Sequence, residues 1–471
     1  KVYYLSERDY ASNIWMFDPA TGAEEQMTFH KDFDVKSLDA FRDAIVYEQG
    51  GYLHLLDPIT KTTEQVTVEV KGDFTFARPR WEDVRSQSWQ NVQVSPNGKR
   101  ALMEHRGEVF TIPKEKGTWR NLTNSPGEAD RYPEWSPLGD QIAWFSDKSG
   151  EYELQVADQQ GKVTNTFALP NPTFYFRPVW SPDGSHIAYT DTDHNIWVVN
   201  LESGVSKKVD TDRYAHPNRA MNPVWSPDSK WIAYARQLES HFKAAFAYEV
   251  ATERRIQLTD GMADVITPVW DQGGKYLYFM ASTDYGLNSG WLDMSSYDPQ
   301  VNRSLYCLVL SAEDSSPTYV ESDEEEVEAE EEVAKGKDKE EVSVRIDPTG
   351  LAQRIVPLGL VEGNFIGLLS APAGNVLVLE RVDGSPGSKL HNYSLEKREA
   401  ELYLEGIRAA QTSFDGAQLL YRKGSSWHLT SAKKKPKAGD GKLSADVKIL
   451  LDPQKEYHQI FLEGWRYMRD F

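Results

Sequence analysis

Oxygen-bearing side chains alternate along one short loop of the chain. Asp191, Asp193 and Asn195 place carboxylate and amide oxygens at every second position. Oxygen ligands at alternate positions are typical of calcium-binding loops, but such loops also carry a later glycine and a bidentate glutamate that are missing here. The loop also falls where two predicted strands need a polar hairpin. We therefore expect a structural turn and no metal site.

Nucleophiles and bases are present without the spacing that catalysis requires. The segment Gly286–Gly290 reads Gly-Leu-Asn-Ser-Gly, with its serine one place away from the nucleophile-elbow position. Neither a His-Glu-x-x-His motif nor a phosphate-binding or dinucleotide-binding glycine motif occurs. Of the ten histidines, His428 lies in a predicted strand, and Cys307 lies in an apolar one, so both are expected to be structural. The sequence predicts no catalytic, cofactor-binding or metal-binding residue in this chain.

A set of polar residues lies directly before the Pro-x-Trp segments, which form the strongest sequence motif of the chain. Its members are Arg131, Tyr132, Arg177, Asn222 and Thr267. Apart from Arg131, which stands beside Tyr132, each comes directly before a Pro-x-Trp segment. If that segment is the innermost strand of a propeller blade, these side chains lie near a central channel. They could contact peptide backbone or a terminal carboxylate. The alternative is that they only hydrate a narrow channel.

The motif belongs to an internal repeat. PEWSPLG, PVWSPDG, PVWSPDS and PVWDQGG begin at residues 133, 178, 223 and 268, which places their tryptophans 45 residues apart. Weaker copies occur near residues 94, 369 and 412. Repeats of this length indicate a solenoid or a propeller, and the apolar pattern here lacks the 3.6-residue period of helices.

Each repeat predicts four strands. The first ends at the tryptophan, and the Ser-Pro-Asp-Gly cluster forms a tight turn in which Pro182 fixes φ and Gly184 accepts a positive φ. Four strands in about 45 residues match one propeller blade. The predicted fold class is therefore all-β: a seven-bladed β-propeller of TolB-like WSPDG repeats over residues 71–453.

The segments before and after the repeat region, residues 1–70 and 454–471, do not carry the WSPDG motif. Residues 1–70 carry IWMFDPATG and YLHLLDPIT, which resemble third strands of two more blades. Because nine blades exceed the usual four to eight, we assign residues 1–70 to the end of another propeller. Residues 454–471 place Ile460, Phe461, Trp465 and Met468 on one face of a predicted helix.

The charge of the chain excludes some partners. A net charge of −20 argues against nucleic acid and anionic membranes. Residues 321–341 hold twelve acidic side chains and three lysines, and we expect this run to be a disordered insertion between blades. It could also act as a partner-binding tail. No run of about 18 apolar residues is present, so no membrane span is predicted.

The two ends of the chain and its single cysteine say little about fold or compartment. One cysteine cannot form an internal disulfide. The chain begins at Lys1 within a predicted strand, without methionine, and stops at Phe471 within a helical pattern. We expect it to be a fragment, so that a leader sequence cannot be judged.

The order of these segments resembles the tricorn protease family. The resemblance covers nearly the whole chain and is carried by residues 76–113, 120–137 and 344–358, by the acidic insertion, and by the linker and helix of residues 441–471. It implies that residues 1–70 end a six-bladed propeller, that residues 71–453 are the seven-bladed one, and that residues 454–471 start a mixed protease core.

The resemblance also implies a function. Tricorn proteases are cytoplasmic homohexameric serine peptidases that degrade peptides, and their propellers are thought to filter peptides into and out of an enclosed chamber. Their catalytic serine and histidine would lie beyond Phe471, so this chain alone is expected to be inactive. The implied partners are peptide substrates and the chain's own protease core domains. The alternative is a TolB-like propeller that binds proteins without enzymatic activity.

Overall fold

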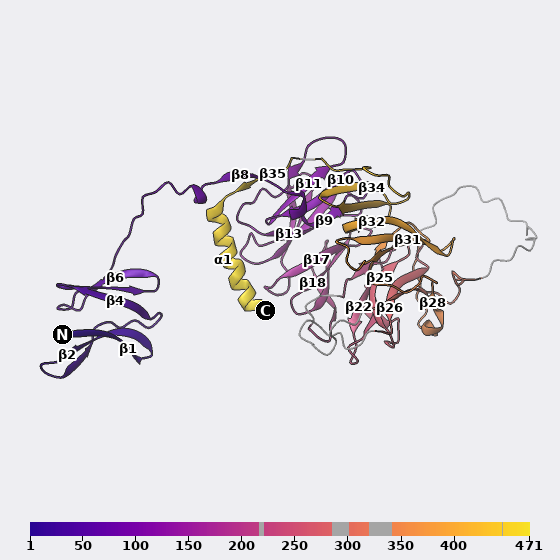
Figure 1. Cartoon of the computed structure of the whole chain (residues 1–471). Coiled ribbons are helices and arrows are strands. Elements are labelled where there is room, and N and C mark those ends of the chain that lie inside the picture. Colours follow the sequence, from indigo (N-terminus) through magenta and orange to yellow (C-terminus); the bar gives the residue numbers. More distant parts are fainter. Residues whose placement is uncertain (216–220, 285–300, 320–341, 445) are drawn as a thin grey trace, which may run out of the picture. The chain divides into compact units, whose positions relative to one another are not determined.

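The chain folds into two compact units (Figure 1). The computed structural model describes residues 1–215, 221–284, 301–319, 342–444 and 446–471, so the acidic run 321–341 and the Gly286–Gly290 segment lie outside the described residues. The units are Lys1–Thr75 and Phe76–Phe471, and each is described by itself. Within the described residues, none of the helices combines the length and the apolar character needed to cross a membrane.

The first unit consists of two antiparallel sheets. One has the order β1-β2-β3 and the other β4-β5-β6-β7. Their strands are β1 (Val2–Asp9), β2 (Ala11–Asp18), β3 (Ala23–Gln26), β4 (Val35–Phe41), β5 (Ala44–Gln49), β6 (Tyr52–Leu56) and β7 (Thr63–Gln65). A single apolar cluster that includes Ile14, Ile45 and Leu56 joins the two sheets. The YLHLLDPIT segment contributes β6, the third strand of its sheet.

The second unit repeats one antiparallel sheet of four strands. The first three sheets contain β9 (Gln90–Val94), β10 (Arg100–His105), β11 (Glu108–Pro113), β12 (Arg120–Asn121), β13 (Asp130–Trp135), β14 (Gln141–Ser146), β15 (Glu153–Asp158), β16 (Val163–Phe167), β17 (Tyr175–Trp180), β18 (His186–Asp191), β19 (Asn195–Asn200) and β20 (Ser206–Thr211). The next two contain β21 (Val224–Trp225), β22 (Trp231–Gln237), β23 (Lys243–Glu249), β24 (Arg254–Gln257), β25 (Asp264–Trp270), β26 (Tyr276–Ser282), β27 (Ser304–Val309) and β28 (Ile355–Pro357).

A six-stranded sheet follows, with the order β29-β30-β31-β32-β33-β34. Its strands are β29 (Phe365–Ser370), β30 (Asn375–Glu380), β31 (Ser388–Ser394), β32 (Glu399–Thr412), β33 (Gln418–Lys423) and β34 (Ser426–Ser431). The long strand β32 pairs with β31 through its first half and with β33 through its second half. It therefore serves two successive blades, as the outer strand of one and the inner strand of the next.

The inner strands form a closed ring. Strands β9, β13, β17, β21, β25, β29 and β32 each contact the next, and β32 contacts β9. Three of the four repeat tryptophans tie their blade to the one before through the indole N–H. Trp180 donates to the carbonyl of Glu134 (3.4 Å), Trp225 to that of Val179 (2.9 Å) and Trp270 to that of Val224 (3.0 Å). The predicted all-β propeller class is confirmed. The number of seven blades stays a prediction, which the ring of inner strands supports.

The predicted turn of the repeat has a simple local cause. Ser181 accepts the amide of Gly184 on its carbonyl (2.9 Å) and the amide of His186 on its hydroxyl (2.9 Å), and Gly184 has φ +72°. A side chain at φ near +70° is strained, so glycine suits this position. The turn thus directs each inner strand into the second strand of its blade.

The ends of the second unit meet where the ring closes. Strand β8 (Arg80–Asp83) pairs with β35 (Lys448–Leu451), and the indole of Trp427 donates to the carbonyl of Ser86 (2.8 Å). An apolar cluster joins residues of β9–β11 to Leu420, Trp427 and Ile449. Short 3-10 helices lie at Thr75–Ala77, Ser86–Ser88 and Leu351–Arg354.

Helix α1 (Pro453–Asp470) follows β35 directly. Asp452 caps its N-terminus and Pro453 occupies the first turn, where a missing N–H is tolerated. The helix lies against the propeller of the second unit (Figure 1). Its buried residues are Pro453, Glu463 and Arg466, so it packs through charged side chains.

Candidate functional site

Four of the predicted channel residues share an unusual backbone conformation. Tyr132, Arg177, Asn222 and Thr267 have φ between +42° and +54°, and so does Asn91 at the matching position of the first blade. A non-glycine residue in this region is uncommon, and a β-branched one such as Thr267 is an outlier. Strained residues of this kind gather at functional sites. The ring of inner strands therefore carries one strained residue in each of five consecutive blades.

The cause is a bulge in the inner strand. Pairing between β13 and β14 shifts between Arg131 and Glu134, so two residues oppose one, and β17 and β25 shift at the matching place. The residue after Tyr132 is Pro133, which has no N–H to give to the ladder. A bulge accommodates such a residue and re-aims the side chain before it.

Neighbouring blades touch through these re-aimed side chains. The guanidinium of Arg177 donates to the side-chain oxygen of Asn222 at 2.6 Å. The ring of Tyr132 meets Phe176 edge-on, with centroids 5.8 Å apart. Arg177 is exposed and forms no ion pair with a described carboxylate. Three of the predicted residues thus come together, while Thr267 stands on the next inner strand round the ring.

A buried carboxyl fixes this arrangement on one side. Glu104 is 5% exposed, and its Oε2 accepts the side-chain amide of Asn91 (2.6 Å) and the backbone amide of Tyr132 (2.9 Å). Burial raises the pKa of this carboxyl, although the two hydrogen bonds oppose the shift. Glu104 therefore links the strained residues of two blades, Asn91 and Tyr132.

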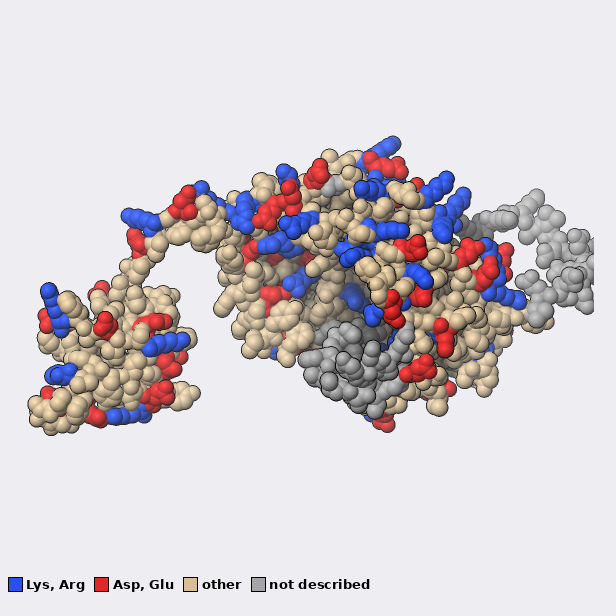
Figure 2. Space-filling view, in the orientation of Figure 1, with Lys and Arg blue, Asp and Glu red and all other residues tan. Residues whose placement is uncertain are grey.

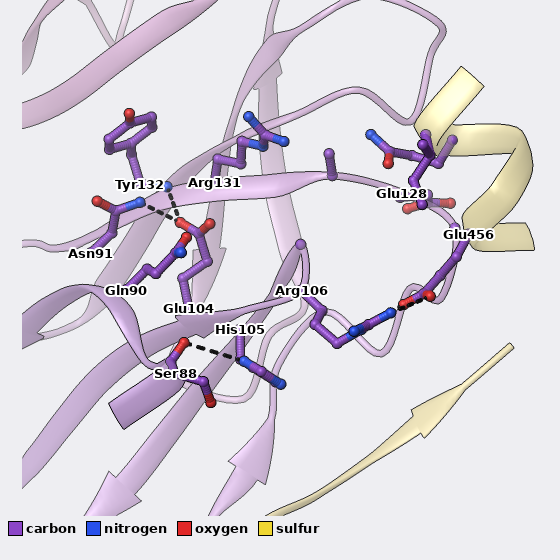
Figure 3. Close-up of a pocket in the computed structure, with 15 residues that line it drawn as sticks. Ser88, Gln90, Asn91, Glu104, His105, Arg106, Glu128, Arg131, Tyr132 and Glu456 are labelled. Atoms are coloured by element: carbon purple, nitrogen blue, oxygen red, sulfur yellow. Dashed lines mark hydrogen bonds and ion pairs between the residues drawn. The ribbon is translucent and has the colours of Figure 1, made fainter. Parts of the chain in front are cut away.

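A cleft of about 480 Å³ opens beside this carboxyl (Figure 3). It lies between β9, β10, β13 and helix α1, and its lining includes Glu104, His105, Arg131 and Tyr132. On the helix side, Arg106 forms an ion pair with Glu456, with Nε 2.9 Å from the carboxylate. The cleft thus combines a polar lining from the propeller with the first turns of α1.

The side chain of Arg131 contacts helix α1. Its guanidinium forms an ion pair with Glu463 of α1 at 2.6 Å, and Tyr152 donates its hydroxyl to the same carboxylate at 3.0 Å. Deeper in the contact, Arg466 pairs with Asp147 at 2.6 Å, and their side chains are 3% and 5% exposed. Arg131 therefore lies in the cleft between the inner strands and helix α1, whereas Tyr132 continues the ring of strained residues.

Two more buried carboxyls, Glu108 of β11 and Asp130 of β13, are expected to make stability depend on pH. Burial raises the pKa of Glu108 to about 7 and that of Asp130 to about 6. Glu108 also accepts the side-chain amide of Asn121 at 2.7 Å. A carboxyl with a raised folded-state pKa keeps a proton that the unfolded chain has released, so its contribution to stability is lost as pH rises from about 5 through about 7.

We expect Glu108→Gln to flatten this dependence. The amide keeps the acceptor for Asn121 and cannot ionise, so the melting temperature should fall less between pH 5 and pH 8 than in the wild type. Thermal unfolding monitored by circular dichroism across this range measures it. The control is Glu202→Gln, at an exposed residue. Identical slopes for wild type and Glu108→Gln would contradict the prediction.

The other sequence candidates take structural places. Asp191 accepts the backbone amide of Asn195 (2.9 Å) and the indole of Trp197 (2.7 Å), and Asp193 is exposed. In the part of the chain that the structure describes, no group of three His, Cys, Asp or Glu side chains is placed to hold a metal. Cys307 is fully buried, and burial raises the pKa of its thiol.

Sequence reasoning missed Asn91 and Glu104. Asn91 stands four residues before Ser95 of the weak first repeat, as Tyr132 stands four before Ser136. Strict alignment of the repeats could therefore have found it. Glu104 lies in a second strand, where the other blades have no carboxyl at the matching bulge, and the sequence carries no signal for it.

Known proteins resemble this chain in sequence and in structure. A "Tricorn protease homolog" from Saccharolobus solfataricus is 23% identical over 485 aligned residues, which cover all of this chain and 42% of the relative. The solved structure described as "Crystal structure of the tricorn protease" superposes with a TM-score of 0.72 at 15% identity. It covers 99% of this chain and 45% of that chain. The chain thus spans less than half the length of these relatives.

A match to a family model identifies the family. The family model described as "Tricorn protease second beta propeller domain" matches residues 89–433, which is most of the chain and runs from the first inner strand to the end of β34. The matched region contains the whole ring of inner strands and all five strained positions. The chain therefore belongs to the family of the tricorn protease second beta propeller domain.

Proposed function

We propose that this chain is the propeller region of a peptide-degrading tricorn-like serine protease, in which it serves as channel, gate and scaffold for a catalytic core beyond Phe471. The observation that carries the proposal is the ring of strained, polar residues on the inner strands. Strain and bulges at the same place in successive blades favour a selected function over simple hydration of the channel.

The chemistry of the ring suits peptides. Arg177 presents an exposed guanidinium, already oriented by Asn222, that can hydrogen-bond a carbonyl or a terminal carboxylate. Asn222 adds an amide, and Tyr132 with Phe176 adds aromatic surface. Peptide main chain offers donors and acceptors at every residue, so such a mixed lining binds it without strong preference for side chains.

Helix α1 supports the role as scaffold. Its charged side is bound to the propeller, whereas Ile460, Phe461, Trp465 and Met468 are 56%, 72%, 54% and 86% exposed. An exposed apolar face on an amphipathic helix marks an interaction surface. We infer that residues 454–471 are the first helix of the core and that this face packs on it, while residues 1–70 end a six-bladed propeller. A cytoplasmic homohexamer belongs to the same proposal.

A blocked channel tests the gate. In the natural full-length polypeptide, Arg177→Cys labelled with a bulky maleimide should lower the rate of peptide degradation at least tenfold. Cys307 is fully buried and does not compete for the label in this region. The matched control is Glu202→Cys, at an exposed residue of the β19–β20 turn, which should keep the wild-type rate when labelled. An unchanged rate with Arg177→Cys would remove the channel from the proposal.

A second experiment tests whether the catalytic residues lie outside residues 1–471. Residues 1–471 alone should not hydrolyse peptides, whereas the full-length polypeptide should. Peptide hydrolysis by the purified chain, retained after size-exclusion chromatography, would overturn the inference that the catalytic residues lie beyond Phe471.

A further inference from the structure

A second cleft lies away from the ring of strained residues, at the outer edge of the propeller between the last two blades. Its volume is about 440 Å³, and it lies between β32, the β33–β34 hairpin and the loop of residues 435–442. Its lining includes four lysines, Lys423, Lys435, Lys437 and Lys442, but only one acidic side chain, Glu405. The chain as a whole carries a net charge of −20, so a basic cleft is a local exception.

The lysines of this cleft keep their charges available. Elsewhere on the second unit, lysines and arginines lie interspersed with acidic side chains, as the face in view in Figure 2 shows. Within the described residues, Lys423, Lys437 and Lys442 form no ion pair, and Lys435 donates its ammonium to the carbonyl of Leu402 at 2.8 Å. Asp440 is the other nearby carboxylate, and it accepts the backbone amide of Lys437 at 2.9 Å.

The cleft is held in shape before any ligand arrives. The hydroxyl of Tyr403 lies within hydrogen-bond distance of two carbonyl oxygens, those of Ala432 (2.9 Å) and Lys434 (2.5 Å), and donates its one hydrogen between them. At the other end of the loop, the amide of Leu429 donates to the carbonyl of Gly441 at 2.8 Å. A Cβ at Gly441 would lie 2.0 Å from the carbonyl oxygen of Leu429, so the loop approaches the strand as closely as glycine allows. A preformed cleft loses less entropy on binding.

A buried histidine, His428, is among the residues that line this cleft. His428 is 8% exposed, stacks on Tyr421 with ring centroids 5.0 Å apart, and bonds the carbonyl of Asp440 through Nδ1 at 3.0 Å. Because a carbonyl only accepts, Nδ1 carries the proton and Nε2 of the neutral ring is an acceptor. No described residue bonds Nε2. This nitrogen can accept a peptide N–H, which a phosphate or a nucleic-acid backbone does not offer.

An open strand edge borders the same cleft. The first half of β32, from Glu399 to Leu404, pairs with β31 and has no strand on its other side among the described residues. Lysines near such an edge often only prevent aggregation. Here they surround a cleft that has the apolar side chains of Leu402 and Pro436 in its walls, as expected for a site that binds a chain.

We propose that this cleft binds an extended acidic peptide segment of a partner protein. The lysines pair with its carboxylates, and Nε2 of His428 accepts one of its backbone N–H groups. The backbone groups on the open edge of β32, apart from the Leu402 carbonyl that accepts from Lys435, bond its main chain. The site lies outside the ring of strained residues, so it does not depend on the proposed channel.

A binding assay on the intact chain tests this proposal. The probe is a fluorescein-labelled decapeptide of alternating glutamate and valine, followed by fluorescence anisotropy at about 50 mM salt. We expect saturable binding that Lys437→Glu/Lys442→Glu weakens at least tenfold, whereas Lys99→Glu/Lys162→Glu, two exposed lysines elsewhere, weakens it less than threefold. A parallel titration with residues 321–341 replaced by a neutral linker removes the chain's own competing carboxylates.

The outcomes separate the alternatives. Equal loss in both double variants would assign binding to net charge and overturn the proposal. Equally tight binding of a ten-nucleotide single strand, or of the glutamine–valine decapeptide, would also overturn it, because the first needs no peptide N–H and the second no carboxylate. Aggregation of Lys437→Glu/Lys442→Glu without loss of binding in its monomeric fraction would assign the lysines to edge protection.

Discussion

Replacing Arg466 by methionine is expected to detach helix α1 from the propeller. Arg466 is the only cation that faces both Asp147 (2.6 Å) and Glu463 (3.5 Å) among the described residues, and it also donates to the carbonyl of Gly150 at 2.6 Å. Its removal leaves two buried carboxylates with one cation fewer. Breaking a buried ion pair by removing one partner costs about 3–5 kcal/mol.

The expected result is local and large. A loss of about 3 kcal/mol corresponds to about a hundredfold faster amide hydrogen exchange for residues 453–470, if the helix exchanges by undocking. Hydrogen exchange followed by mass spectrometry measures it, and the propeller strands should keep their protection. Asp147→Asn should act in the same direction, because it removes the other charge of the pair.

The neighbouring ion pair supplies the control. Arg469 pairs with Glu151 at 2.5 Å, but these side chains are 27% and 40% exposed. Exposed pairs contribute about 0–1 kcal/mol, so Arg469→Met should change the exchange of α1 less than about fivefold. If Arg466→Met and Arg469→Met had equal effects, the buried network would not be what holds the helix.

Gly416→Ala is expected to destabilise the propeller far more than the same change at Gly374. Both glycines lie in blade turns with similar φ, +66° and +77°. At Gly374 a Cβ would meet nothing within 4 Å, whereas at Gly416 it would lie 2.3 Å from the carbonyl carbon of Ala371 in the neighbouring blade. The pair therefore separates backbone strain from a steric clash.

The expected losses of stability follow from backbone strain and from the steric clash. The left-handed conformation costs an alanine about 1–2 kcal/mol at either position. Gly416→Ala adds an overpacking term of about 1–3 kcal/mol, because the contacted atoms are backbone and cannot change rotamer. Urea unfolding followed by tryptophan fluorescence should give a clearly lower midpoint for Gly416→Ala than for Gly374→Ala. Coincident curves would mean that the blades separate to admit the methyl group.

Much of the fold could be predicted from the sequence because each blade is encoded locally. The tryptophans at 45-residue spacing and the Ser-Pro-Asp-Gly turns specify strands and reversals within a few residues. The positions before Pro133, Pro178, Pro223 and Pro268 share a left-handed backbone, and that they face a channel stays a prediction. The backbone strain itself could not be predicted, because it depends on how the bulge fits between neighbouring strands.

By itself, the sequence determined the repeat, the strands and turns within each blade, and the amphipathic helix at residues 454–471. The tertiary structure alone decided which face of that helix is bound, since Arg466 meets Asp147 across 319 residues of chain. It also decided that Glu104 joins Asn91 to Tyr132, and that four lysines from β33 and a later loop share one cleft. Local propensity fixes short-range hydrogen bonds, whereas contacts between distant segments form only when the ring of blades closes.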